Sequence, residues 1–130
     1  VTNHKDMKQI RTLILFVLAG FLICSCEYEW IEPEKVDIPD NVSFANDVMP
    51  IFNNGCNTSV CHGAGASDPD LSEGNAYNAL LNGGYVDTET PEASSIYTCM
   101  ISGGSMQSYV QNPADAEIIL AWIKQGAENN

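Results

Sequence analysis

Two thiols and an imidazole lie close together in the chain, at Cys56, Cys61 and His62. A pair of cysteines followed directly by histidine is typical of covalent c-type haem attachment. Each thiol can add to one vinyl group of the porphyrin, and His62 lies close enough to reach the iron from one face. Four residues separate the cysteines instead of two, so the spacer must bulge away from the porphyrin. Residues 57–59 are small and polar, which suits such a loop.

Two other sites are compatible with the same residues. A disulfide between Cys56 and Cys61 would leave His62 on the surface, and the protein would then be a binding or structural module without haem. Zinc is the third possibility, but structural zinc usually has four Cys or His ligands, and this region offers three.

The first 25 residues have the pattern of a secretory signal peptide. A basic leader (His4, Lys5, Lys8, Arg11) precedes the apolar run 13–23, which is shorter than the roughly 20 residues of a membrane span. Ile23 and Ser25 stand before Cys26 as in a bacterial lipobox, so we expect Cys26 to be lipidated. The signal peptide, residues 1–25, would then be removed and the protein held at the cell envelope by its lipid.

An acidic, proline-containing tether is expected over residues 26–42, between the lipid and the domain. Acidic residues directly after a lipidated cysteine resemble the surface-export signal of Bacteroidetes lipoproteins, which implies the outer membrane, although a plain solvated spacer is equally compatible. Of the five basic residues, only Lys35 and Lys124 follow position 26, and the chain has a net charge of −12. This charge excludes nucleic-acid binding and favours basic partners.

An all-α domain of about four short helices is predicted over residues 43–130. Ser43 can cap a first helix over 44–52, and Asn112 can cap the last one over 113–125. Two helices are expected between them, over 72–81 and 91–101, with Gly-rich loops as connections. Helices this short bury little apolar surface, and domains of this size often need a cofactor or a crosslink to be stable.

Three segments of the domain resemble the small monohaem class I c-type cytochromes, especially the lipoprotein cytochromes of Bacteroidetes. The segments are FANDVMPIF at 44–52, CHG at 61–63 and ILAWIKQGA at 119–127. Their order along the chain matches as well, and the resemblance covers residues 42–130. It implies a cytochrome c-like fold around one haem c, attached through Cys56 and Cys61. The four-residue spacer departs from the usual family pattern.

The same resemblance implies roles for individual residues. His62 would bind iron through Nε2, the Pro69 carbonyl would accept from its other ring nitrogen, and Leu71 would pack on the porphyrin. A methionine is expected as the sixth ligand, since His/Met ligation suits electron transfer. Met106, in the Gly-rich loop 102–106, is the first choice and Met100 the alternative.

The function expected from these residues is electron transfer with redox partner proteins, because two filled axial positions leave no site for a small-molecule substrate. Enzymatic turnover is therefore not expected. Cys99 lies in an apolar helical pattern and is expected to be a buried, inert thiol. Donors for the haem propionates would come from backbone amides or from Tyr77, Tyr85, Tyr97 and Trp122, among which the sequence does not choose.

Overall fold

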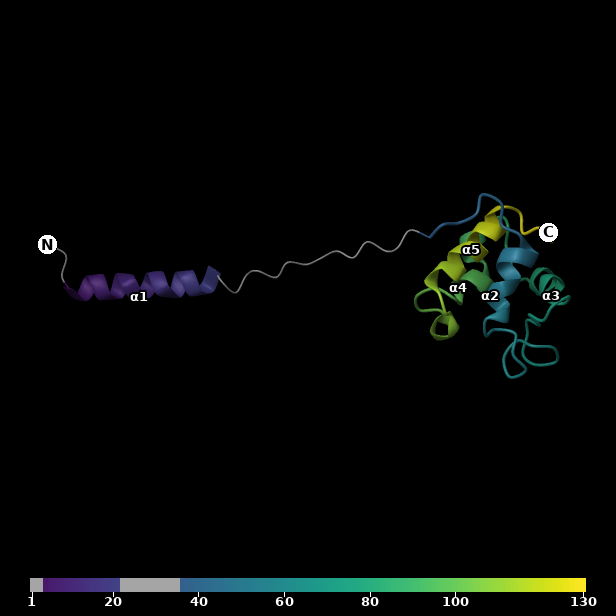
Figure 1. Ribbon diagram of the computed structural model, residues 1–130, viewed down its shortest axis with the longest axis horizontal. Coiled ribbons are helices and arrows are strands. Elements are labelled where there is room, and N and C mark those ends of the chain that lie inside the picture. The colour runs from purple at the N-terminus through teal and green to yellow at the C-terminus, as the bar shows by residue number, and fades with distance from the viewer. Residues whose placement is uncertain (1–3, 22–35) are drawn as a thin grey trace. The chain divides into compact units, whose positions relative to one another are not determined.

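A computed structural model describes residues 4–21 and 36–130, and the chain divides into two units, Val1–Glu34 and Lys35–Asn130 (Figure 1). The described part of the first unit is helix α1, His4–Phe21, of 18 residues. Neither α1 nor any other described helix has the length and apolar character needed to cross a membrane. The expected lipidation at Cys26 lies outside the described residues, as does the tether up to residue 35.

The second unit consists of short helices and loops, and residues 36–130 contain no strand. The predicted all-α class is therefore confirmed for the described chain. The α-helices of this unit are α2 (Met49–Asn53), α3 (Ala76–Asn82), α4 (Ser95–Thr98) and α5 (Pro113–Lys124). A π-helical turn, η1 (Phe44–Val48), leads into α2, and the 3₁₀ turns are η2 (Pro91–Ala93) and η3 (Gln107–Tyr109).

The first helical segment begins where its capping residue predicts. Ser43 Oγ accepts a hydrogen bond from the Asn46 amide at 3.1 Å, and the Asp47 carboxylate accepts from the Ser43 amide at 2.7 Å. The helix changes from π to α at Met49, so that Pro50 lies in the first turn of α2, where its missing N–H costs no hydrogen bond. The helix predicted over 44–52 is thus divided into η1 and α2.

Helix α5 also forms as predicted and carries much of the core. Asn112 Oδ1 accepts from the Ala114 amide at 3.0 Å, with Pro113 in the first turn. Trp122 is 1% exposed and is packed among other fully buried side chains of the same helix. The helix ends at Lys124, and Gly126, two residues later, has a φ of 102°, a conformation that favours glycine.

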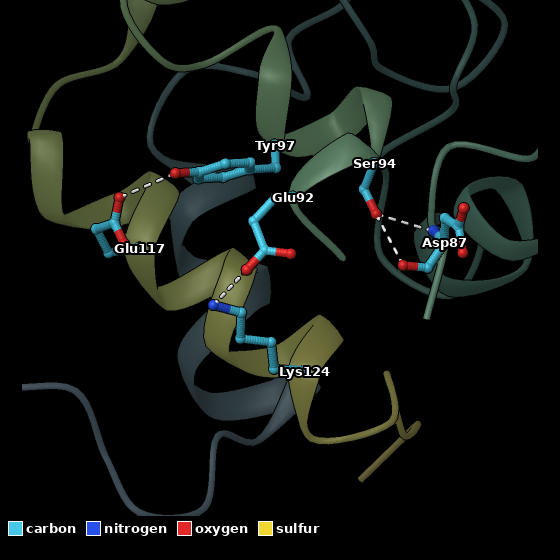
Figure 2. A network of polar contacts seen from close by, with 6 residues as sticks. All are labelled: Asp87, Glu92, Ser94, Tyr97, Glu117 and Lys124. Carbon is cyan, nitrogen blue, oxygen red and sulfur yellow. Dashed lines mark hydrogen bonds and ion pairs between the residues drawn. The ribbon is translucent and has the colours of Figure 1, made fainter. Parts of the chain in front are cut away.

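The two middle helices are shorter than predicted. Residues 72–75 form a turn instead of the start of α3, because Gly74 has a φ of 83°, which a right-handed helix does not allow. The expected helix over 91–101 divides at Ser94, whose ψ of 128° is extended. Ser94 Oγ accepts from the Asp87 amide at 2.9 Å and donates to the Asp87 carbonyl at 3.2 Å (Figure 2). These side-chain bonds compete with a continuous helix.

A cluster of aromatic rings joins the beginning of the domain to its end. The ring of Phe44 lies 5.3 Å from that of Tyr77 and 5.1 Å from that of Trp122, measured between centroids. Val42, expected at the end of the tether, is 2% exposed, and its amide donates to Gln125 Oε1 at 2.7 Å. The packed domain therefore includes at least this residue of the expected tether.

Two side-chain contacts hold the segment 91–98 against α5. Tyr97 donates from its hydroxyl to Glu117 Oε1 at 3.2 Å, and Lys124 Nζ pairs with Glu92 Oε1 at 2.7 Å (Figure 2). Partial burial, together with the charge of Glu117, raises the pKa of Tyr97. These contacts fix α4 on α5, and α4 carries residues that line the cavity described next.

Candidate functional site

The domain contains a cavity of about 620 Å³. Its walls come from the end of α2, the following loop up to Leu71, the α4 region and the loop 105–111. The volume falls within the range of small-molecule and cofactor pockets. Every residue that the sequence nominated for haem attachment, iron ligation or haem packing lines this cavity: Cys56, Cys61, His62, Pro69, Leu71, Met100 and Met106.

Cys56 and Cys61 are held by backbone hydrogen bonds at the two ends of a folded loop. The Cys56 amide donates to the Phe52 carbonyl at 2.9 Å, which extends the last turn of α2. The Cys61 amide donates to the Thr58 carbonyl at 3.0 Å, closing a turn within the spacer. Residues 58–60 are exposed, and the Val60 side chain is 85% exposed. The spacer thus forms a surface turn with a cysteine at each side.

The three cysteines of the described chain are free and half-buried. Burial raises the pKa of Cys56, and the negative charges of Asp115 and Cys61 raise it further. Burial also raises the pKa of Cys99. Both groups therefore remain protonated thiols near neutral pH. The disulfide between Cys56 and Cys61, which was the alternative to haem attachment, is not formed in this structure.

Cys99 differs from its prediction. It lines the cavity and is half-buried, whereas we expected it to be fully buried. The reason is that α4 ends at Thr98, so that Cys99 lies at its C-terminus beside the cavity and not within a longer helix. Its thiol contacts the Ile96 carbonyl at 3.3 Å.

The ring of His62 is oriented by a backbone carbonyl. Its Nδ1 lies 3.2 Å from the carbonyl oxygen of Ser67. A carbonyl can only accept, so Nδ1 must carry the proton in this contact, which leaves the lone pair of the neutral ring on Nε2. This is the tautomer that binds a metal through Nε2.

The Pro69 carbonyl was the wrong choice for this contact. The Ser67 amide donates to the Cys61 carbonyl at 3.0 Å, which turns the loop back toward the histidine and brings the Ser67 carbonyl onto the ring. Pro69 is buried in the cavity wall. Leu71 is 3% exposed, and its amide donates to the His62 carbonyl at 2.7 Å.

The two candidate methionines occupy different environments in the cavity wall. Met100 is 7% exposed, whereas Met106 is 36% exposed and lies in the loop before η3. The Met106 amide donates to the Cys99 carbonyl at 2.8 Å, which folds this loop back onto the end of α4. Gly104 makes the fold possible, because a Cβ there would collide with the carbonyl oxygens of Thr98 and Cys99.

The polar residues of the cavity wall include two carboxylic acids, Asp68 and Asp115, and no Lys or Arg from the described chain. Burial raises the pKa of Asp115. Within residues 4–21 and 36–130, the cavity wall included, no group of three or more His, Cys, Asp or Glu side chains is arranged to hold a metal ion.

The structure shows which of the possible propionate donors are already hydrogen-bonded elsewhere and which one lines the cavity. Tyr77 donates to the Ala127 carbonyl at 3.0 Å, and Trp122 Nε1 donates to the Glu128 carbonyl at 2.9 Å. Tyr97 is bound to Glu117, as described above. Of the four aromatic donors named from the sequence, Tyr85 alone lines the cavity.

The sequence did not nominate Tyr109, which lines the cavity as well and is 65% exposed. Tyr109 follows Met106 by only three residues, and this proximity could have nominated it as a residue of the same site.

No protein-family model, curated protein or solved structure matches this chain. The resemblance to class I c-type cytochromes therefore depends on the three sequence segments at 44–52, 61–63 and 119–127.

Proposed function

We propose that the protein is a monohaem electron carrier, with haem c bound covalently through Cys56 and Cys61. His62 and Met106 are the axial ligands of the iron in this proposal. One observation carries it: two free thiols, an oriented imidazole and two thioethers from separate segments all line one cavity. These are the groups that covalent attachment and His/Met ligation require.

The residues present fit this cofactor in three respects. The cavity has the volume of a cofactor pocket, and apolar side chains such as Ile51, Phe52 and Ile96 form part of its wall. The thiols are not joined to each other, so both are available to vinyl groups. The contact of His62 with Ser67 leaves Nε2 with the lone pair that iron needs.

Bound haem would supply a one-electron ferric/ferrous couple, whose potential His/Met ligation raises. The chain's own residues hold and shield that group. Ser67 fixes the histidine tautomer. Leu71 and Pro69 would cover part of the apolar surface of the haem, and Tyr85, which lines the cavity, could donate to a propionate. Since both axial positions are filled, the protein passes electrons to protein partners and does not turn over a substrate.

The proposal includes attachment to the bacterial cell envelope. It is supported by the basic and apolar leader followed by Cys26 in a lipobox pattern. Labelling with a radioactive fatty acid should mark the wild-type protein and leave Cys26→Ala unlabelled. Equal labelling of the two would contradict lipidation at this position.

The methionines provide a specific test of ligation. We expect Met106→Ala, produced with haem-maturation proteins, to lose its low-spin spectrum and to bind carbon monoxide when reduced. Met100→Ala is the matched control, because it removes the other thioether of the same cavity wall and should keep the spectrum. The opposite pattern would assign ligation to Met100.

A second candidate function is a haem sensor or haem enzyme with an open iron position. The exposure of Met106, 36%, favours this alternative, since a side chain at the surface is easily displaced. An unchanged reduced spectrum and unchanged carbon monoxide binding in both Met106→Ala and Met100→Ala would support the open site and contradict His/Met ligation.

A further inference from the structure

Gly63, the residue after the histidine, is in contact with the spacer between the two cysteines. A Cβ built on Gly63 would lie 2.7 Å from the Thr58 carbonyl oxygen and 2.8 Å from the Asn57 carbonyl oxygen. Real Cβ atoms do not approach backbone atoms so closely, and backbone cannot rotate away as a side chain can. Any residue other than glycine would therefore displace the carbonyls of Asn57 and Thr58.

The Thr58 carbonyl accepts two of the hydrogen bonds that fold the attachment loop. The Thr58 carbonyl accepts from the Cys61 amide at 3.0 Å and from the Gly63 amide at 2.9 Å. The Cys56 carbonyl accepts from the His62 amide at 3.0 Å. These bonds set the separation of the two thiols and hold His62 between two hydrogen-bonded neighbours.

We infer that Gly63 is a positioning residue, required because backbone carbonyls of the spacer lie against it. Deleting Thr58 and Ser59 would restore the C-x-x-C-H spacing, and it would remove the closest contact of the glycine, the Thr58 carbonyl. Gly63 and the spacer thus form one unit that places both thiols and the imidazole together. The contacts between Gly63 and the spacer do not depend on haem, whereas their role in haem attachment rests on the proposed function.

The experiment combines two changes, Gly63→Ala and deletion of residues 58–59, which creates C-x-x-C-H. All four combinations are produced with haem-maturation proteins, and the fraction of chains carrying covalent haem is measured after denaturation. In the native spacer we expect Gly63→Ala to lower this fraction about tenfold, because the new methyl group overpacks the backbone. In the shortened spacer the same substitution should have a smaller effect, since the closest contact, the Thr58 carbonyl, is gone and only that of Asn57 remains.

Gly65→Ala is the matched control in the same loop. Gly65 has a φ of 75° and nothing within 4 Å of a Cβ, so its substitution strains the backbone without a collision. Its cost should be the same with either spacer. The spectrum of His62 ligation in the surviving holoprotein should change with Gly63→Ala and not with Gly65→Ala.

Two results would overturn the inference: wild-type haem content in Gly63→Ala with the native spacer, or equal losses with both spacers. If the shortened chain does not fold, the two substitutions are compared in the native spacer. An equal loss of haem in Gly63→Ala and Gly65→Ala would then contradict the inference. If no variant acquires haem, including wild type, the proposed function fails instead. The unfolding midpoints of the same variants then test the contact itself. Gly63→Ala should still lower the midpoint more in the native spacer than in the shortened one.

Discussion

The aromatic cluster and the cavity wall are two regions of one domain that use apolar residues differently. Phe44, Tyr77 and Trp122 pack directly on one another with centroids 5.1–6.4 Å apart, and they join the two ends of the domain. Around the cavity, apolar side chains such as Ile96 and Met100 line a space of about 620 Å³. The comparison shows that one region is filled by the chain's own side chains, whereas the other leaves a space, which haem would occupy in the proposed function.

The largest effect should come from removing the means of attachment. The double variant Cys56→Ala/Cys61→Ala is expected to lose covalent haem entirely and most of the stability of the holoprotein, about 5 kcal/mol or more. Thermal unfolding followed by circular dichroism measures this loss. Cys99→Ala is the control, because Cys99 lines the same cavity and has no attachment role in this account. Equal unfolding temperatures for the double variant and wild type would contradict the dependence of the cavity region on haem.

Truncating a side chain of the aromatic cluster should destabilise the protein both with and without bound haem. Trp122→Ala is expected to lower the free energy of unfolding by about 3–5 kcal/mol, because a 1% exposed indole leaves a void that the backbone cannot close. Denaturant titration measures the change. Tyr109→Ala serves as comparison and should cost about 0.5 kcal/mol or less, as Tyr109 is 65% exposed. A small effect at Trp122 would mean that this region is not closely packed.

A smaller effect is expected at the start of α5. Asn112→Ala removes the oxygen that accepts from the Ala114 amide and should cost about 1 kcal/mol. Asn112→Ser keeps a capping oxygen and should restore most of that loss. If serine and alanine destabilise the protein equally, the cap does not stabilise the helix.

The smallest effect is a pH dependence from Asp115 in the cavity wall. Burial raises its pKa above the ordinary value, so the folded protein binds this proton more tightly than the unfolded one. The free energy of unfolding should therefore fall as pH rises from about 3.9, the ordinary aspartate value, through the raised pKa. Asp115→Asn should lack this fall when the two proteins are titrated in parallel. A wild-type protein that gains stability relative to Asp115→Asn over the same pH range would contradict the assignment.

Features that depend on neighbours in the chain could be predicted from the sequence. Ser43 and Asn112 cap their helices through amides three and two residues away, and both were predicted. The division at Ser94 was missed because its partner Asp87 is seven residues away, outside any local helical pattern. Val42 was assigned to the tether because its partner, Gln125, is 83 residues away.

The same distinction applies to the candidate site. Spacing along the chain nominated the thiols and His62, and the resemblance to class I c-type cytochromes added Met106. All four residues line one cavity. The choice of acceptor for His62 depended on how the loop after it turns, which a bond between Ser67 and Cys61 determines. The collision that requires glycine at position 63 likewise arises from the three-dimensional course of the spacer.

The central claim is that Cys56 and Cys61 bind a porphyrin. The most direct measurement is the intact mass of the denatured protein after production with haem-maturation proteins. The account predicts the mass of the chain plus one haem, and this addition should disappear in Cys56→Ala/Cys61→Ala. A folded wild-type protein with the mass of the bare chain, lacking two hydrogens because the cysteines are joined to each other, would contradict it.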